Sequence, residues 1–165
     1  MLERSPLRTK MVTGTAIASL GDLIRQSENK GQGFDWKSFL IFSLWGGAVF
    51  TPIAHHWYGI IGKVIPESLG AFRFVAMMAM DQTLFPPAVT SLTFFSLTLL
   101  LGGTPQGGVE KVQRDLWPTL LTNWKVWPLV QALNFKFVPP QLQVLTVNVT
   151  AVWWNYVLSK TQASS

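Results

Sequence analysis

Long stretches without a charged residue constrain this sequence more than any other feature. Residues 38–62 and 82–109 contain no Asp, Glu, Lys or Arg, and neither does the stretch 137–159. A helix needs about 20 predominantly apolar residues to cross the hydrocarbon core of a bilayer, and each of these stretches is long enough. The sequence therefore predicts an all-α, membrane-embedded bundle.

The overall composition agrees with lipid as the main solvent of this chain. Its 165 residues are enough for one domain, and only 13% of them are charged, whereas ordinary soluble domains have roughly 25%. The net charge of +5 is spread along the sequence and does not form the clustered basic patch that marks nucleic-acid binding. Scattered positive charge beside apolar stretches is typical of contact with anionic lipid headgroups, so we expect membrane lipids and not nucleic acid as partners.

Four stretches are candidate membrane spans within a single membrane domain that covers residues 1–165. These are residues 11–26, 38–62, 82–101 and 141–159. The first is the weakest candidate, and a short amphipathic helix on the membrane surface is the alternative for it. Pro52 lies inside the second span and should kink the helix or end its first half, because proline lacks a backbone donor.

Small residues recur on one side of the first candidate span. Gly14, Ala18 and Gly21 fall close to one face of a helix. Small side chains let the backbones of membrane helices approach closely. This face is therefore expected to pack against a neighbouring helix.

An aromatic and basic segment precedes the last span. Tryptophan rings favour the headgroup region of a membrane, and a lysine beside them can extend its ammonium group toward phosphate. We predict that residues 110–137 form an interfacial amphipathic segment, anchored by Trp124, Lys125 and Trp127.

Polar side chains inside the spans indicate where a function could lie. An ionisable residue at membrane depth is costly and usually faces the protein interior or a water-filled cavity. Asp81 is the clearest case, and Arg73, two turns earlier, is a candidate partner for it. The predicted pore lining or polar network consists of Asp81, Gln82, Asn134, Asn155 and His55.

The last span carries a polar stripe with two interpretations. Gln141, Asn148 and Asn155 recur every seven residues, so they lie on one side of an otherwise apolar helix. The stripe could line a hydrophilic pathway. It could equally hold neighbouring helices together through amide hydrogen bonds.

Signatures of enzymes are absent from the sequence. It contains no phosphate-binding Gly-Lys-Ser/Thr loop, no Gly-x-Ser-x-Gly elbow and no His-Glu-x-x-His motif. His55 and His56 are adjacent, so they point about 100° apart on a helix and cannot chelate one metal from the same face. We therefore expect no catalytic activity, no cofactor and no metal.

Several motifs together resemble the Mpv17/PMP22 family of small integral membrane proteins. The resemblance extends over nearly the whole chain and is carried by Gly21-Asp22-x-x-x-Gln26, Pro52-x-x-His55-x-Trp57-Tyr58, Asp81-Gln82, Trp124-x-x-Trp127-Pro128-x-x-Gln131-x-x-Asn134-Phe135-x-x-Val138-Pro139, Trp154-Asn155 and Leu158-Ser159. Ser38 and Ile41 depart from it, because family members usually have arginines at these places. Any anion-attracting role of those positions is therefore in doubt here.

The resemblance implies a protein of the mitochondrial inner membrane, with the peroxisomal membrane as the alternative. It also implies a small channel for metabolites or ions that contributes to mitochondrial homeostasis. Four short helices rarely enclose a wide channel, so such a pathway would be narrow or would be formed by several copies in a homo-oligomer. The rival hypothesis is a non-conducting membrane scaffold that supports organelle integrity or a partner complex.

Overall fold

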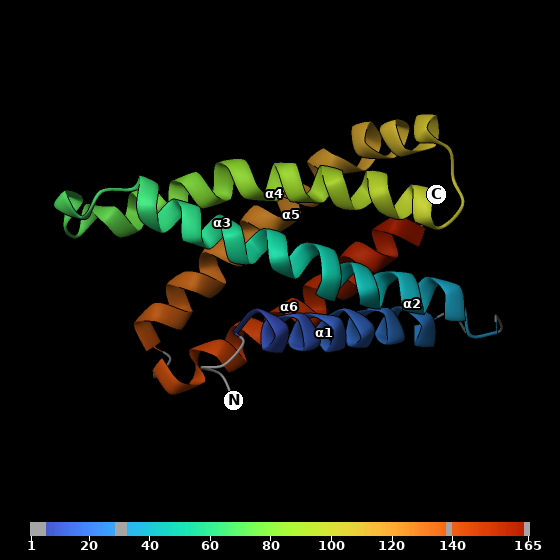
Figure 1. Cartoon of the computed structure of the whole chain (residues 1–165), viewed down its shortest axis with the longest axis horizontal. Helices are drawn as coiled ribbons and strands as arrows, with labels where there is room; N and C mark the ends of the chain where they lie inside the picture. The colour runs from blue at the N-terminus through green and yellow to red at the C-terminus, as the bar shows by residue number, and fades with distance from the viewer. Residues whose placement is uncertain (1–5, 29–32, 138–139, 164–165) are drawn as a thin grey trace.

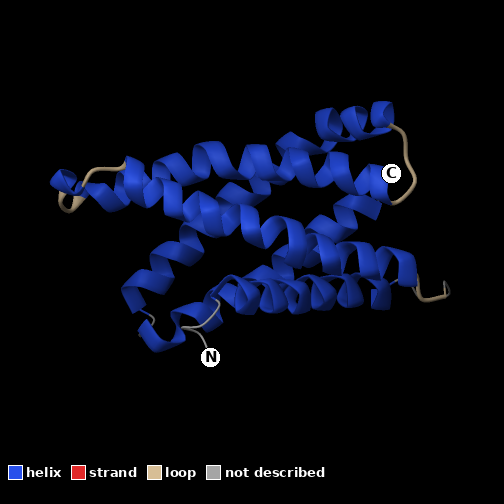
Figure 2. Ribbon diagram, in the orientation of Figure 1, coloured by secondary structure: helices blue, strands red, loops and turns tan. Residues whose placement is uncertain are grey.

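Helices account for nearly all of the chain that the computed structural model describes, which is residues 6–28, 33–137 and 140–163 (Figure 1, Figure 2). The α-helices are α1 (Pro6–Glu28), α2 (Trp36–Leu44), α3 (Thr51–Val64), α4 (Phe72–Leu100), α5 (Pro105–Phe137) and α6 (Pro140–Ala163). A π-helical segment, η1 (Trp45–Phe50), joins α2 to α3, and a 3₁₀ turn, η2 (Glu67–Leu69), precedes α4. The predicted all-α architecture is confirmed.

The helices pack in two groups, one around α1 and one around α4. α1 packs against α2, η1 and α6, while α4 packs mainly against α5 (Figure 1). α5 crosses behind α4 and leads down to α6, which returns behind α1. As a result, the first and last helices of the chain are direct neighbours.

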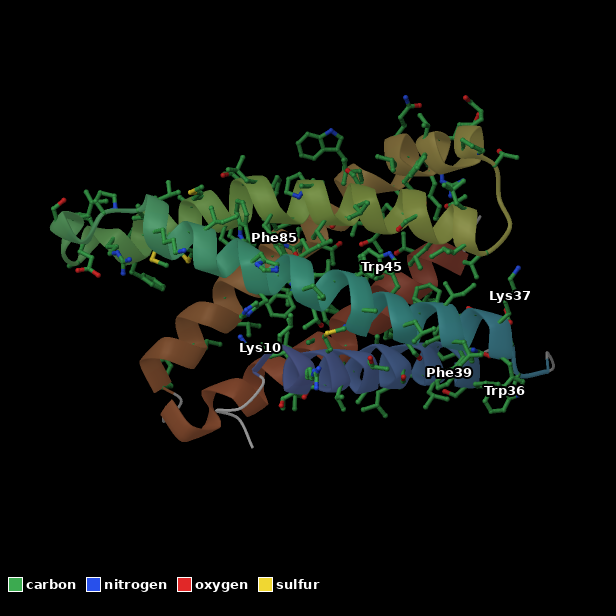
Figure 3. All side chains as sticks on the ribbon, in the orientation of Figure 1. Lys10, Trp36, Lys37, Phe39, Trp45 and Phe85 are labelled. Atoms are coloured by element: carbon green, nitrogen blue, oxygen red, sulfur yellow. The ribbon has the colours of Figure 1, made fainter. Side chains whose placement is uncertain are left out.

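Pro52 is accommodated by the π-helical segment that precedes it. Because proline has no N–H, the helix cannot keep its regular hydrogen bonds at this point. The backbone N–H of Thr51 instead reaches the carbonyl of Gly46, and the Thr51 hydroxyl donates to the same oxygen over 2.8 Å. Trp45, labelled in Figure 3, fixes this segment to α4 by donating its Nε1 hydrogen to Ser96 Oγ. The predicted disturbance at Pro52 is thus a change of helix type, and the helical path continues.

α4 is longer than the sequence suggested. All but the last residue of the expected span 82–101 lies within a helix that begins at Phe72 and continues through Pro86 and Pro87 without a break. The sequence suggested Asp81 as a partner of Arg73, but the two residues are not paired. Its guanidinium donates to the carbonyls of Ile65 and Gly62, which are left without helical partners at the end of α3. This arginine therefore belongs to the turn between two helices.

Small residues of α1 lie at its closest helix contacts, as predicted. A methyl group added to Gly14 would collide with Thr51, and Ala18 is buried against Gly46. At Gly21, an added Cβ would lie 2.6 Å from Asn155 Cβ and 2.9 Å from the Tyr156 backbone nitrogen. The backbones of α1 and α6 therefore approach each other too closely for any side chain at this position.

Two stretches of the described chain are long and apolar enough to cross a membrane, judged by length and composition. They are Trp36–Val64 and Phe72–Leu100; the first contains the predicted span 38–62, and the second contains all but the last residue of the predicted span 82–101. The other two predicted spans, 11–26 and 141–159, lie within α1 and α6. For these two helices, crossing the membrane stays a prediction.

We predict that Gly21→Val destabilises the protein, because the new side chain would overlap the backbone of α6. Overpacking of this kind costs about 1–3 kcal/mol or more. The matched control is Gly59→Ala on α3, where no atom lies within 4 Å of an added Cβ. That change should instead stabilise the helix by about 0.5–1 kcal/mol. Unfolding of both variants in detergent micelles measures the difference, and equal effects would refute the proposed close contact.

Candidate functional site

The interior of the described bundle is unusually polar. Its buried side chains include six hydrophobic ones and ten polar or charged ones, among them Asp22, Arg25, Lys111 and Asn123. Large apolar side chains lie outside instead, as at Phe72, which is 76% exposed. Because lipid favours apolar surfaces and polar groups seek partners inside, this distribution is the one expected of a membrane bundle.

Asp81 and Gln82 lie together in one polar cluster, as the sequence predicted. Trp57 on α3 donates its Nε1 hydrogen to one carboxylate oxygen of Asp81 over 2.9 Å. Gln82 donates its side-chain amide to the other oxygen over 3.0 Å. Asn123 on α5 completes the cluster through Nδ2 and the Gln82 Oε1 atom, 3.5 Å apart. Three helices therefore meet around this carboxylate.

Trp124 has an internal role that sequence reasoning missed. Pro86 lacks an N–H, so the carbonyl of Gln82, four residues earlier, loses its helical partner. The indole Nε1 of Trp124 donates to that carbonyl over 2.9 Å. An unpaired carbonyl is costly where no water can reach it, and this bond removes the cost. The missed signal was the pairing of a mid-helix proline with a tryptophan on another helix.

α5 carries a polar face that also went unrecognised in the sequence. The spacing places Lys111, Asp115, Thr119 and Thr122 on one side of the helix, with Asn123 at its edge. An open cavity of about 120 Å³ lies on this face between α5 and α6, and it is large enough for several water molecules. Its lining residues are Asp115, Pro118, Thr119, Thr122, Val157 and Thr161. The polar face leads from the start of α5 toward the Asp81 cluster.

Thr119 is a buried residue that lines this cavity. Its side chain is buried, and its hydroxyl has no hydrogen-bond partner among the described residues. A buried hydroxyl normally finds a partner in protein or ordered water. The cavity beside it offers room for such water. A buried hydroxyl without a protein partner therefore lies beside a space that is large enough for water.

A buried ion pair lies at the outer end of the same face. Lys111 is only 3% exposed and places Nζ 3.2 Å from Asp115 Oδ2 and 2.7 Å from the carbonyl of Thr161. Burial lowers the pKa of the Lys111 ammonium group. The hydrogen bond from Arg114 lowers the pKa of Asp115, so this carboxylate stays ionised. Asp115 thus lines the cavity with a carboxylate that is paired with the buried Lys111.

The remaining predicted site residues lie elsewhere. His55 places Nδ1 3.3 Å from the Nζ atom of Lys10 on α1 (Figure 3). Asn155 donates to the Ala151 carbonyl of its own helix and packs against Gly21. The side chain of Asn134 lies outside the described residues, as do those of Gln141 and Asn148. Among the predicted residues whose side chains are described, Asp81 and Gln82 are therefore the ones brought together.

The predicted interfacial anchors lie on α5, which packs against α4 and α6. Lys125 is exposed, and the ring of Trp127 lies 6.4 Å from that of Trp154 on α6. A position at the membrane surface stays a prediction for both. Trp124 differs from them because its polar atom is used inside the protein.

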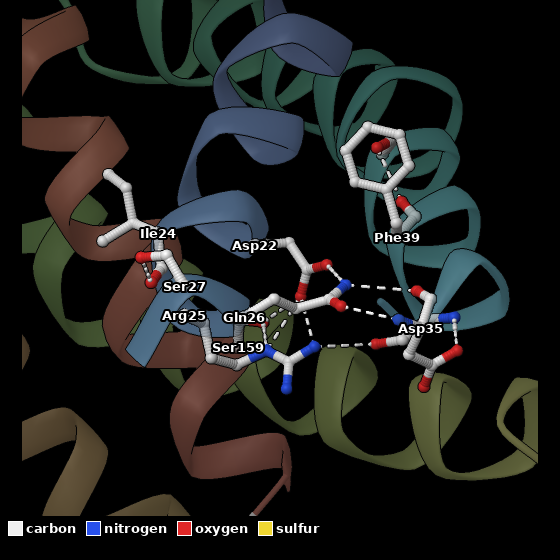
Figure 4. A network of polar contacts seen from close by, with 10 residues as sticks. Asp22, Ile24, Arg25, Gln26, Ser27, Asp35, Phe39 and Ser159 are labelled. Carbon is white, nitrogen blue, oxygen red and sulfur yellow. Dashed lines mark hydrogen bonds and ion pairs between the residues drawn. The ribbon is translucent and has the colours of Figure 1, made fainter. Parts of the chain in front are cut away.

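A second buried cluster joins α1, α2 and α6 (Figure 4). Asp22 is completely buried and pairs with Arg25, whose Nη2 atom lies 2.8 Å from Asp22 Oδ1. Ser159 on α6 donates to the same carboxylate over 2.6 Å, while Arg25 Nε donates to Ser159 Oγ over 2.7 Å. Arg25 also donates to Ser38 Oγ on α2 over 3.0 Å. One ion pair therefore links three helices.

Arg25 supplies a cation where the sequence appeared to have lost one. The family resemblance leads one to expect an arginine where Ser38 stands, and the guanidinium of Arg25 lies within hydrogen-bond distance of that serine. Gln26 connects the cluster to the start of α2 by donating to Asp22 Oδ2 and accepting from the Asp35 N–H. Opposite charges three residues apart in an apolar stretch were the available signal for this pair.

We predict that Trp124→Phe destabilises the protein by about 1–3 kcal/mol, because the Gln82 carbonyl loses its donor. Pro86→Ala restores the helical N–H, so Trp124→Phe should cost much less when combined with it. Trp117→Phe is the control, since Trp117 is 62% exposed. Unfolding free energies of the four combinations at positions 86 and 124 give the coupling. Equal costs of Trp124→Phe with and without Pro86 would contradict this account.

We also predict that Arg25→Met destabilises the protein by about 3–5 kcal/mol, because it leaves the Asp22 charge buried without a cation. Adding Asp22→Asn should recover much of that loss, since no charge then remains. Lys160→Met is the matched control, because it breaks an ion pair with Glu28 in which both partners are exposed. Thermal unfolding in micelles ranks the three variants. A similar loss of stability from Arg25→Met and Lys160→Met would contradict a stabilising role of the buried Asp22–Arg25 ion pair.

Comparison with known proteins supports the resemblance seen in the sequence. The profile of the Mpv17/PMP22 family matches residues 98–159. Protein sym-1 of Neurospora crassa is 37% identical over 96% of this chain and 92% of its own length. For Protein SYM1 of Saccharomyces cerevisiae these values are 33%, 96% and 84%, and for Peroxisomal membrane protein 2 of Bos taurus they are 29%, 93% and 82%. No solved structure matches. The chain therefore belongs to the Mpv17/PMP22 family and is a protein of an organelle membrane.

Proposed function

We propose that this chain forms a narrow pore for small metabolites or ions in the mitochondrial inner membrane. The observation that carries the proposal is the polar inner face of α5, with its open cavity and its approach to the Asp81 cluster. A solute moving along this face would meet the hydroxyls of Thr119 and Thr122 and then the amides of Asn123 and Gln82. The proposal assigns no catalytic chemistry to the chain.

The size of the cavity supports a narrow path. A volume of about 120 Å³ lies below the roughly 300–1,000 Å³ of usual ligand pockets. A wide apolar groove of about 480 Å³ between α3 and α4 does not offer an alternative path, because Ile53, Phe85 and other apolar groups line it. Larger metabolites would require the helices to move apart or several copies to assemble around a shared pathway.

The peroxisomal membrane is the alternative location. One relative is a peroxisomal membrane protein by name. The polar face of α5 would serve equally well in either membrane.

A non-conducting scaffold is the alternative function, and one observation favours it. Both oxygens of Asp81 already accept hydrogen bonds from protein groups, so the cluster can act as a link between helices. Under this alternative the polar groups contribute to stability and carry no solute. The two functions differ in what happens when a polar group is removed without changing its shape.

The test is single-channel current from the purified protein in a planar bilayer. Thr119→Val removes the cavity hydroxyl and keeps the shape, so conductance should fall by several-fold because an apolar wall disfavours water. Thr83→Val is the control, since this exposed hydroxyl on α4 donates to Ala79 of its own helix and does not line the cavity. Asp81→Ala, measured alongside, should change ion selectivity.

Each outcome of that recording has a definite meaning. Discrete openings that change with Thr119→Val and not with Thr83→Val would support the pathway along α5. Openings that are indifferent to both would keep a pore and move it away from this face. A silent bilayer that contains folded protein would favour the scaffold.

A further inference from the structure

The last turns of α6 form one wall of the cavity on α5. Val157 and Thr161 line the cavity, and Ser159 lies between them in the sequence. Lys111 of α5 holds this segment through the Thr161 carbonyl. Ser159 is completely buried and is held from the opposite direction by Asp22 and Arg25 of α1. The end of α6 is therefore fixed between two buried ion pairs.

These two ion pairs connect α6 to different helices. The Lys111–Asp115 pair lies within α5, the helix that forms the opposite wall of the cavity. The Asp22–Arg25 pair ties α6 to α1 and, through Ser38, to α2. α1 and α2 do not line the cavity. The second pair thus determines how α6 sits relative to a helix layer outside the cavity.

We propose that Arg25 is a positioning residue that holds α6 against α1 and α2 and thereby fixes the place of the cavity wall that α6 forms. This inference rests on the proposed function for its consequence in conduction, but its geometry can be tested without any current. The guanidinium is suited to the role because it bonds three helices at once in a fixed fork. When the pair breaks, Asp22 is left as an unpaired charge away from water, so α1 and α6 must separate enough to hydrate it.

The close contact at Gly21 strengthens the argument. The backbones of α1 and α6 touch there, next to Asp22 and one turn before Arg25, so a shift of α6 cannot be absorbed by flexible side chains in between. Packed interfaces of this kind switch between discrete arrangements and do not deform gradually. Release at Arg25 should therefore move the last turns of α6 as a unit.

The sequence makes a direct test available, because the chain contains no cysteine. Thr119→Cys places a single thiol in the cavity, where the native side chain is only 4% exposed. The readout is its rate of reaction with a water-soluble, membrane-impermeant thiol reagent in reconstituted vesicles. Thr83→Cys on the exposed side of α4 is the control position.

Arg25→Gln should change the rate of modification of the cavity thiol by about tenfold, a typical size for coupling between sites, and leave the control thiol unchanged. The decisive variant is Arg25→Ser combined with Ser38→Arg, which moves the guanidinium from α1 to α2 across a 3.0 Å contact. It should return the rate to that of the parent, because the cation again reaches Asp22 and Ser159. Asp22→Asn combined with Arg25→Gln replaces Arg25→Gln if that variant does not fold; it should also change the rate, because the guanidinium that bonds Ser159 and Ser38 is gone.

An unchanged rate at the cavity thiol in folded Arg25→Gln, or in the charge-free double variant, would overturn the proposal. A changed rate without restoration by the transposed arginine would also overturn it, since a general loosening would then explain the result. Failure of the proposed function looks different. In that case the thiol rates follow the predicted pattern while the bilayer stays silent.

Discussion

A backbone carbonyl that loses its helical donor inside a bilayer must find another donor within the protein. This requirement explains several contacts that otherwise look unrelated. The Trp124 indole donates to the carbonyl released by Pro86. The Arg73 guanidinium donates to two carbonyls at the end of α3. A proline inside one helix and the end of another are thereby each converted into a fixed link.

The same requirement separates the molecule into two polar centres with different characters. The Asp81 cluster uses neutral donors, the indole of Trp57 and the amide of Gln82, and no cation among the described residues pairs with this carboxylate. The Asp22 cluster pairs its carboxylate with an arginine. The second arrangement is suited to holding helices together, because breaking a buried ion pair is strongly destabilising.

The sequence was most informative where a property is local. Charge-free stretches identified the helices of the fold, and the spacing of Gly14, Ala18 and Gly21 identified a packing face. Asp81 and Gln82 were found because they are adjacent. The polar face of α5 was missed because its prolines and tryptophans favour a surface segment when read alone, and only packing against α4 and α6 turns that face inward. Links such as Trp124 to Gln82 join residues 42 positions apart, so no local pattern predicts them.

The guanidinium at the junction of α1, α2 and α6 has a consequence for how related chains are compared. A comparison made one position at a time treats positions 25 and 38 as unrelated. In three dimensions they are neighbours, because the Arg25 guanidinium bonds the Ser38 hydroxyl. A cation attached to either helix would lie at the same junction, so the place of a charge in space can be kept while its position in the sequence changes.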